Sequence, residues 1–187
     1  MDRKIIKSAL FAAAIAAAGC STGPLSPEQQ AIVDAIQQNN RQVENITFSL
    51  LEKIDSASLG EELDRRINLF ETKIEVETGF IRKYSKKGMP ANRQKHVQGR
   101  KQAQSILKAV KELAESLEDS RDSIIYRTYI FSCKGNFTDG AKFRCEKEYI
   151  NITSDGKAYN MSPEDERHMN MGFTIPGYSD LLGSVAE

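Results

Sequence analysis

Apolar side chains at helical spacing are the feature that most constrains how this chain can fold. Three stripes of them recur at three-, four- and seven-residue intervals between residues 26 and 122, and glycine or proline separates each stripe from the next. Such a stripe forms one face of an amphipathic helix, and that face must be buried against a neighbour. The pattern therefore predicts long helices that pack on one another.

The first stripe begins at a strong helix-start signal. Ser26 is a favoured cap residue, Pro27 suits the first helical position, and Gln29 can close a capping box. The apolar positions that follow are Ile32, Ile36, Val43, Ile46, Leu50 and Ile54. We expect one helix through this stripe, ending before Gly60.

The second and third stripes are separated by Gly88-Met89-Pro90, where proline prevents a helix from continuing. The second stripe contains Leu63, Ile67, Phe70, Ile74, Ile81 and Tyr84. The third contains Ala103, Ile106 or Leu107, Val110, Leu113 and Leu117, near the 3.5-residue spacing of a coiled coil. Short connections make neighbouring helices antiparallel, so residues 26–122 are predicted to form a coiled-coil-like antiparallel three-helix bundle. Pairing of the long helices with another chain is the alternative.

From Ser123 the pattern changes to β-branched and aromatic residues, which favour strands. Thr138-Asp139-Gly140 and Ser154-Asp155-Gly156 are typical of turns, and they predict a β-hairpin or a three-strand meander that ends near Tyr159. Ser162-Pro163-Glu164 predicts a short C-terminal helix, and the tail from Gly172 is expected to be irregular. The predicted fold is mainly α, with a small β module over residues 123–187.

Cys133 and Cys145 lie six residues before and six residues after Asp139. A hairpin folded at Asp139 would place the two cysteines opposite one another. The sequence therefore predicts a cross-strand disulfide that closes the β module, since a bridge of this kind can stabilise a small sheet.

The first twenty residues are typical of an export signal, because a basic lead precedes a short apolar run and small residues. The run is too short to span a bilayer as a helix. Ala17-Ala18-Gly19-Cys20 resembles the lipobox of bacterial lipoproteins. The resemblance implies a signal peptide over residues 1–19, an acyl chain such as palmitate on Cys20, and a tether over residues 20–25. Ordinary cleavage after Ala18 is the alternative, and it would leave Cys20 as an odd thiol.

The lipobox resemblance also implies a location. Ser21 resembles the sorting signal of lipoproteins that reach the outer membrane, so the protein is expected at the cell envelope, lipid-anchored and facing the periplasm. Nucleic acid is not an expected partner outside the cytoplasm.

Between Glu77 and Glu112 every charged residue is basic, while acidic residues gather on either side. The candidate contact residues for an anionic surface are Arg82, Lys83, Lys86, Lys87, Arg93, Lys95, Arg100 and Lys101. In a three-helix bundle the second helix returns to the lipidated end, so this basic segment would face the headgroups of the anchoring membrane. A solvated helical face and a polyanionic partner such as lipopolysaccharide are the alternatives.

Sequence signals for catalysis are weak. Two histidines, His96 and His168, are present, and the chain has no phosphate-binding glycine loop, helical zinc pair or nucleophile elbow. We therefore expect no enzyme and no cofactor. Met161, His168 and Met171 are soft ligands of the type that Cu(I) prefers, although methionines beside a short helix also fill gaps in cores.

Asp139-Gly140-Ala141-Lys142-Phe143 resembles the loop with which periplasmic lysozyme inhibitors, which are eight-stranded barrels, block their target. The hypothesis favoured by the sequence is a non-catalytic binding or scaffolding component of the envelope, with an envelope protein as partner. The alternatives are an inhibitor or exclusion factor acting through the 133–145 hairpin, and a copper-binding envelope protein. The sequence gives no oligomeric state.

Overall fold

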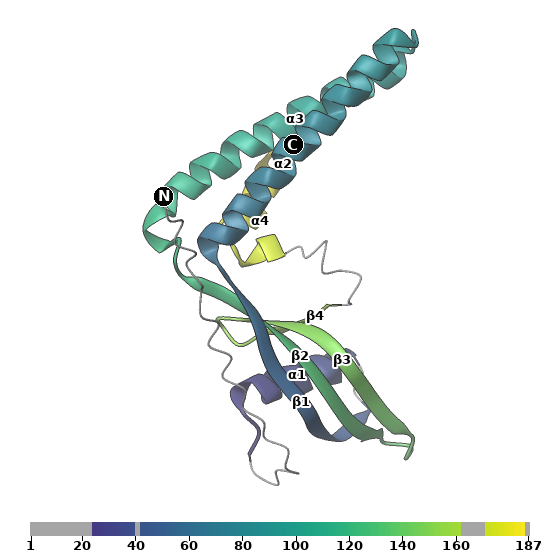
Figure 1. Ribbon diagram of the computed structural model, residues 1–187, viewed down its shortest axis with the longest axis vertical. Helices are drawn as coiled ribbons and strands as arrows, with labels where there is room; N and C mark the ends of the chain where they lie inside the picture. Colours follow the sequence, from purple (N-terminus) through teal and green to yellow (C-terminus); the bar gives the residue numbers. More distant parts are fainter. Residues whose placement is uncertain (1–23, 40–41, 162–170, 186–187) are drawn as a thin grey trace, which may run out of the picture.

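The computed structural model describes residues 24–39, 42–161 and 171–185 (Figure 1). The elements, in chain order, are α1 (Pro27–Asn39), β1 (Val43–Ser58), α2 (Leu59–Lys86), α3 (Pro90–Ser116), η1 (Glu118–Ser120), β2 (Ile124–Phe137), β3 (Lys142–Thr153), β4 (Ala158–Met161), η3 (Met171–Thr174) and α4 (Tyr178–Val185). The predicted signal peptide over residues 1–19, Cys20, and the helix start predicted at Ser162 lie outside the described residues.

The sheet has four antiparallel strands in the order β1-β2-β3-β4. Its first two strands are neighbours in space but not in sequence, because the α2–α3 hairpin lies between them in the chain. Figure 1 shows the two helices leaving the end of the β1–β2 ladder side by side, as an arm that projects away from the sheet. The molecule is therefore a sheet with a long helical arm.

The predicted three-helix bundle is wrong, because the first stripe divides into a short helix and a strand. Helix α1 ends at Asn39, and Val43–Ser58 pairs along its length with β2. Ile46 and Leu50 lie at helical spacing, but with Phe48 between them they also fit the two-residue period of a strand. Pairing with β2, a contact that the local pattern does not contain, settles the choice in favour of the strand. The fold is mixed α and β, and the sheet draws strands from both sides of residue 123.

Several local predictions are confirmed. The Gln29 backbone N–H donates to Ser26 Oγ at 3.2 Å, and the Ser26 N–H donates to Gln29 Oε1 at 2.9 Å, which completes the capping box. Helices α2 and α3 form an antiparallel hairpin that turns between Lys86 and Pro90. The β2–β3 and β3–β4 turns lie at the two predicted Asp-Gly positions. Local rules therefore locate these caps and turns correctly.

The predicted register of the cysteines is confirmed, but the predicted disulfide is absent. Cys133 and Cys145 are directly opposite one another on β2 and β3, and both are free cysteines. Burial raises the pKa of the Cys133 thiol to about 12, and it also raises the pKa of Cys145. Burial therefore disfavours the thiolate at both cysteines, and the thiolate is the form that attacks in disulfide formation.

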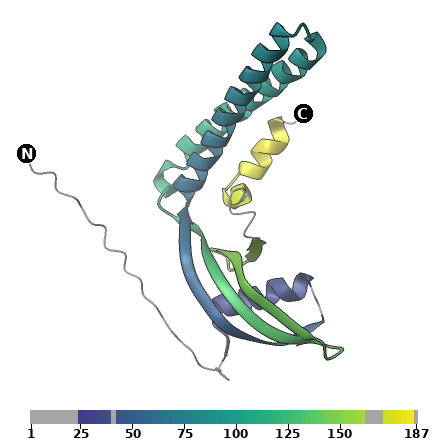
Figure 2. The same cartoon turned by 45° about the vertical axis from the view of Figure 1, so that its right-hand side comes forward.

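Two apolar cores stabilise the molecule, one at each end of the sheet. In the first core, α1 packs Ile32 and Ile36 against Tyr129 and Phe131 of β2 and Ile150 of β3. Figure 2 shows α1 lying across one face of the curved sheet. This core fixes the start of the described chain to the sheet.

The second core lies where the arm joins the sheet. Leu63 of α2 and Val110 of α3 pack against Tyr126 of β2, and η3 and α4 add Ile175 and Tyr178. The expectation of an irregular tail after Gly172 is therefore wrong, because α4 packs its apolar residues on the base of the arm (Figure 2). The arm is thus clamped at its base from two sides.

Candidate functional site: the tip of the helical arm

The free end of the arm is a tight helical turn. Helix α2 ends with a hydrogen bond from Lys87 N–H to the Lys83 carbonyl at 3.2 Å, and Met89 N–H donates to the Tyr84 carbonyl at 3.1 Å. Gly88 has a φ of +62°, a left-handed conformation that glycine adopts without strain. Pro90 then occupies the first turn of α3, where its missing N–H has no helical partner to lose. Gly88-Met89-Pro90 therefore forms the apex of the arm.

Six of the eight basic residues predicted to form a contact surface lie within seven residues of Met89 at this apex, and Arg100 and Lys101 lie further down α3. The exposed members are Arg82, Lys83, Lys86, Lys87, Arg93, Lys95 and Lys101, while Arg100 is partly buried. Within the part of the chain that the structure describes, none of these eight cations forms an ion pair with a carboxylate. We call these eight residues, together with Met89, the basic tip. Their positive charge is uncompensated by neighbours on the same molecule.

Below the apex, an aromatic and histidine cluster ties α2 to α3. The His96 ring stacks on Phe80 with centroids 4.7 Å apart and on Tyr84 with centroids 5.3 Å apart. His96 Nδ1 lies 2.6 Å from Glu77 Oε2. Lys83 Nζ lies 5.6 Å from the Phe80 ring centroid, within cation–π range. This cluster makes the distal half of the arm a rigid support for the basic tip.

Gly99 gives the Glu77 carboxylate room to reach His96. A Cβ at position 99 would lie 3.0 Å from Glu77 Oε1. This cluster is absent from the sequence predictions, in which His96 is one of two histidines and has no predicted partner. Phe80 and Tyr84, one helical turn apart and facing a histidine across the predicted hairpin, are the signal that could have indicated it.

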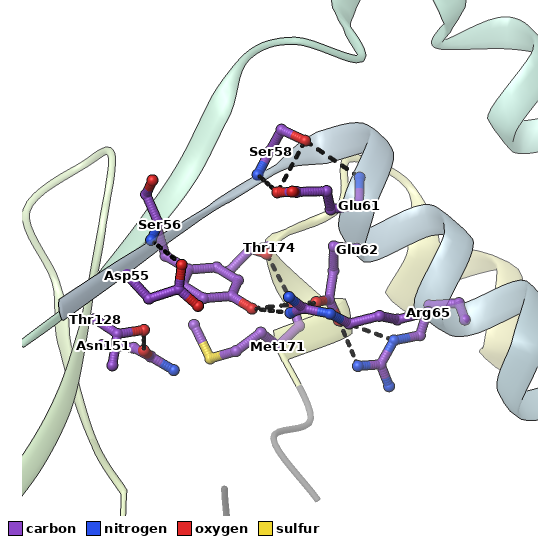
Figure 3. Close-up of polar contacts among 12 residues, drawn as sticks. Asp55, Ser56, Ser58, Glu61, Glu62, Arg65, Thr128, Asn151, Met171 and Thr174 are labelled. Carbon is purple, nitrogen blue, oxygen red and sulfur yellow. Dashed lines mark hydrogen bonds and ion pairs between the residues drawn. The ribbon is translucent and has the colours of Figure 1, made fainter. Parts of the chain in front are cut away.

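A buried polar network fixes the base of the arm to the sheet (Figure 3). Glu62 of α2 is fully buried, and its Oε1 accepts a hydrogen bond from Arg66 Nε at 2.9 Å. Its Oε2 accepts from Arg65 Nη1 at 3.1 Å and from Tyr126 Oη at 3.2 Å. Because Tyr126 belongs to β2, the network joins the helix to the strand. A buried carboxylate held in this way resists reorientation of the arm.

The same network perturbs the titration of Tyr126. Burial, followed by the negative charge of Glu62, raises the pKa of the phenol to about 12. The Arg65 guanidinium opposes this shift and lies 2.6 Å from the phenol oxygen. Tyr126 therefore stays protonated as a hydrogen-bond donor at any physiological pH.

The strand-to-helix connection sets the direction of the arm. Ser58 ends β1 and caps α2 directly, because Glu61 N–H donates to Ser58 Oγ at 3.2 Å and Ser58 N–H donates to Glu61 Oε2 at 2.8 Å (Figure 3). With no loop between the two elements, the helix continues away from the sheet. The capping box therefore leaves little freedom at the point where the arm begins.

The basic tip lies at the wrong end for the topology that the sequence predicted. A returning second helix would have brought it beside the start of α1, but the tip and α1 lie toward opposite ends of the long axis (Figures 1 and 2). The reason is that β1 replaces the second half of the predicted first helix and carries the chain along the sheet before α2 begins. The tip therefore points away from the N-terminal part of the described chain.

The structure gives little support to the other candidate sites. Met171 is 4% exposed within the core at the base of the arm, which is a packing position, and His168 and the side chain of Met161 lie outside the described residues. The Asp139 turn caps a strand pair in a four-stranded sheet, whereas the inhibitor resemblance implied an eight-stranded barrel. Among the described residues, no group of three or more His, Cys, Asp or Glu side chains could hold a metal ion.

Comparison with known proteins gives no match to a family model, to a curated protein or to a solved structure. Within the described ranges, no helix has the length and apolar character needed to cross a membrane. The candidate site consists of tip cations that have no carboxylate partner among the described residues, a rigid stack below the apex, and a clamped base.

Proposed function

We propose that this chain is a lipid-anchored envelope protein whose helical arm presents the basic tip to a partner at a distance from the anchor. It acts as a non-catalytic binding or spacing component. An acyl chain on the lipobox-like Cys20 would anchor the protein, and the arm would hold the basic tip at a distance from that anchor. Within this proposal the sheet and α1 form the body that connects the two.

The observation that carries this proposal is the separation of charge along a rigid arm. Acidic residues lie in residues 61–77 and 112–122, from the base of the arm to just past the middle of α2, while the tip has only basic ones. The base is fixed by the buried Glu62 network, and the distal half is fixed by the Glu77–His96 pair. An arm that is stiff at both ends and charged at its tip is suited to contact rather than catalysis.

The proposal is tested by photo-crosslinking in cells. A photoreactive residue at Met89, which is 43% exposed at the apex, should capture an envelope component. The same residue at Val76, which is 51% exposed on the side of α2, is the matched control and should capture much less. Equal capture from both positions, or none from Met89, would contradict a contact function for the tip.

The anchor is tested separately. Cys20→Ala should release the protein from the membrane fraction or block its processing, since the lipid would be lost. Mature Cys20→Ala protein that remains in the membrane fraction would contradict the lipid anchor.

A further inference from the structure

We infer that the basic tip binds an anionic phospholipid bilayer, and that this bilayer is a different one from the bilayer that holds the lipid anchor. The second half of this inference rests on the proposed function, because it needs Cys20 to be acylated. The first half depends only on the described residues of the tip.

The shape of the tip favours a surface over a small ligand. It is the convex end of a helical hairpin (Figure 1), whereas small molecules bind in concave sites. Its cations lie on both helices and around the turn, on long side chains that can adapt to a plane of headgroups. The tip is therefore matched to an extended anionic surface.

The chemistry of the apex favours a bilayer over a soluble polyanion. Met89 is 43% exposed at the furthest point of the arm, between Lys87 and Arg93. An apolar side chain ringed by cations is the arrangement that lets a protein enter the headgroup layer while its charges stay at the surface. A soluble polyanion would use the charges but would leave Met89 in water.

The distribution of charge on the arm also orients it. In the lower half of the two helices, residues 59–72 and 103–116, six acidic side chains outnumber four basic ones, and Glu75 lies just past the midpoint of α2. Glu71 and Glu112 are paired with Lys111 and Lys108, but a plane of anionic headgroups would repel the remaining acidic excess. An arm that lay flat on the membrane would bring these carboxylates against it. An arm that stands on its tip keeps them away, so the contact is end-on.

The length of the arm separates the two surfaces. Helix α2 has 28 residues, which at about 1.5 Å per residue gives about 42 Å. The body of the protein adds the length of the sheet, with α1 toward its far end (Figure 2). The predicted tether of residues 20–25 spans at most about 20 Å. An end-on contact at the tip therefore falls on a surface other than the one that holds the tether.

Bilayer binding is tested with the unacylated mature chain carrying Cys20→Ser. Because the sequence has no tryptophan, Met89→Trp introduces a single reporter at the apex. Vesicles of phosphatidylcholine with about one third phosphatidylglycerol should shift its emission to shorter wavelength, whereas pure phosphatidylcholine should not. Val76→Trp, at a similarly exposed position on the side of the arm, is the control and should show no shift. A shift at Val76, or none at Met89, would overturn end-on insertion.

The charge requirement is tested with two matched quadruple variants of the unacylated chain. Replacing Arg82, Lys83, Lys86 and Lys87 with glutamine should weaken vesicle binding at least about 100-fold. Replacing Lys53, Lys134, Lys142 and Lys147, which are exposed on the sheet, removes the same charge and should weaken it less than about 10-fold. Equal losses would mean that net charge, not the tip, drives binding. A soluble polyanion that gave the same Met89→Trp shift as vesicles would overturn the bilayer assignment.

Contact with a second bilayer is tested by tethering. The acylated protein, reconstituted in phosphatidylcholine vesicles, should aggregate added anionic vesicles, as measured by light scattering. Binding of the soluble chain without aggregation would overturn the two-bilayer arrangement while leaving tip binding intact. Absence of acylation in cells would overturn the anchor of the proposed function, but it would not affect the vesicle assays on the unacylated chain.

Discussion

At the scale of single residues, charged side chains occur in two opposite arrangements, one buried and paired and the other exposed. Glu62 is fully buried and is satisfied by Arg66, Arg65 and Tyr126, so its charge stabilises a joint. The cations of the tip are exposed and have no carboxylate partner among the described residues. The first arrangement favours internal stability, and the second leaves charge available for a partner.

The buried phenol of Tyr126 should make stability fall at high pH. Its pKa is raised from the ordinary value of 10 to about 12 in the folded protein, so the folded state holds the proton more tightly than the unfolded state does. The resulting contribution is fully present below pH 10 and is lost as the pH rises toward 12. It amounts to about 2 to 3 kcal/mol, from about 1.4 kcal/mol per pKa unit.

The measurement is urea denaturation of the wild type and of Tyr126→Phe between pH 9 and pH 12. Wild-type stability should decline more steeply, because the variant lacks the titrating group. Tyr129 and Tyr178 also have raised pKa values, but they are present in both proteins and cancel in the difference. Parallel declines would show that Tyr126 titrates normally.

At the scale of elements, the two helices of the arm carry glycines with different surroundings. A Cβ added at Gly79 of α2 would meet nothing within 4 Å, whereas one at Gly99 of α3 would lie 3.0 Å from Glu77 Oε1. Gly79→Ala should therefore stabilise the protein by about 1 kcal/mol, the ordinary helical preference for alanine. Gly99→Ala should lose most of that gain, because it displaces the carboxylate that holds His96.

Thermal unfolding of the Gly79→Ala and Gly99→Ala variants checks this prediction. If the two alanine variants gained the same thermal stability, the contact between Gly99 and Glu77 would not constrain the arm.

Strand β1 shows at the same scale why periodicity alone does not distinguish a helix from a strand. Its apolar residues Ile46, Leu50 and Ile54 are spaced for a helix, and Ile46, Phe48 and Leu50 are spaced for a strand. A helix would have satisfied its backbone hydrogen bonds locally. Instead, residues Val43 to Ser58 form inter-strand hydrogen bonds with β2. The pairing partners lie between 66 residues (Ser58 with Ile124) and 94 residues (Val43 with Phe137) further along the chain, where no local window detects them.

At the scale of the whole molecule, the Glu62 network decides whether arm and sheet behave as one body. Glu62→Gln would remove the negative charge that compensates the buried Arg66 guanidinium. Breaking a buried pair by removing one partner costs about 3 to 5 kcal/mol. We expect Glu62→Gln to lower the free energy of unfolding by about that amount.

The matched control is Asp64→Asn, two residues along the same helix. Asp64 pairs with Arg121 at 2.8 Å, but its side chain is 56% exposed, so its loss should cost less than about 1 kcal/mol. Chemical denaturation measures both changes. Similar losses for the two variants would mean that the Glu62 joint is no stronger than a surface ion pair.

The sequence by itself determined where several elements begin and turn, and how charge is arranged along the chain. The capping box at Ser26, the break at Gly88-Met89-Pro90 and the turn at Asp139-Gly140 depend on a few neighbouring residues, so short-range rules suffice for them. The basic segment is also predicted from the sequence, because the charge of each side chain follows directly from the identity of the residue. The sequence did not indicate that Glu62 is buried or that Glu77 meets His96.

Only the tertiary structure decided where those pieces lie. Residues 43–58 form a strand because β2 pairs with them, and this one change turns the predicted bundle into a sheet with an arm. The same change moves the basic tip from beside the N-terminal part of the described chain to the far end of the molecule (Figure 1). The physical reason is that hydrogen bonding between distant segments, not local periodicity, fixes the conformation of a segment whose pattern fits both periods.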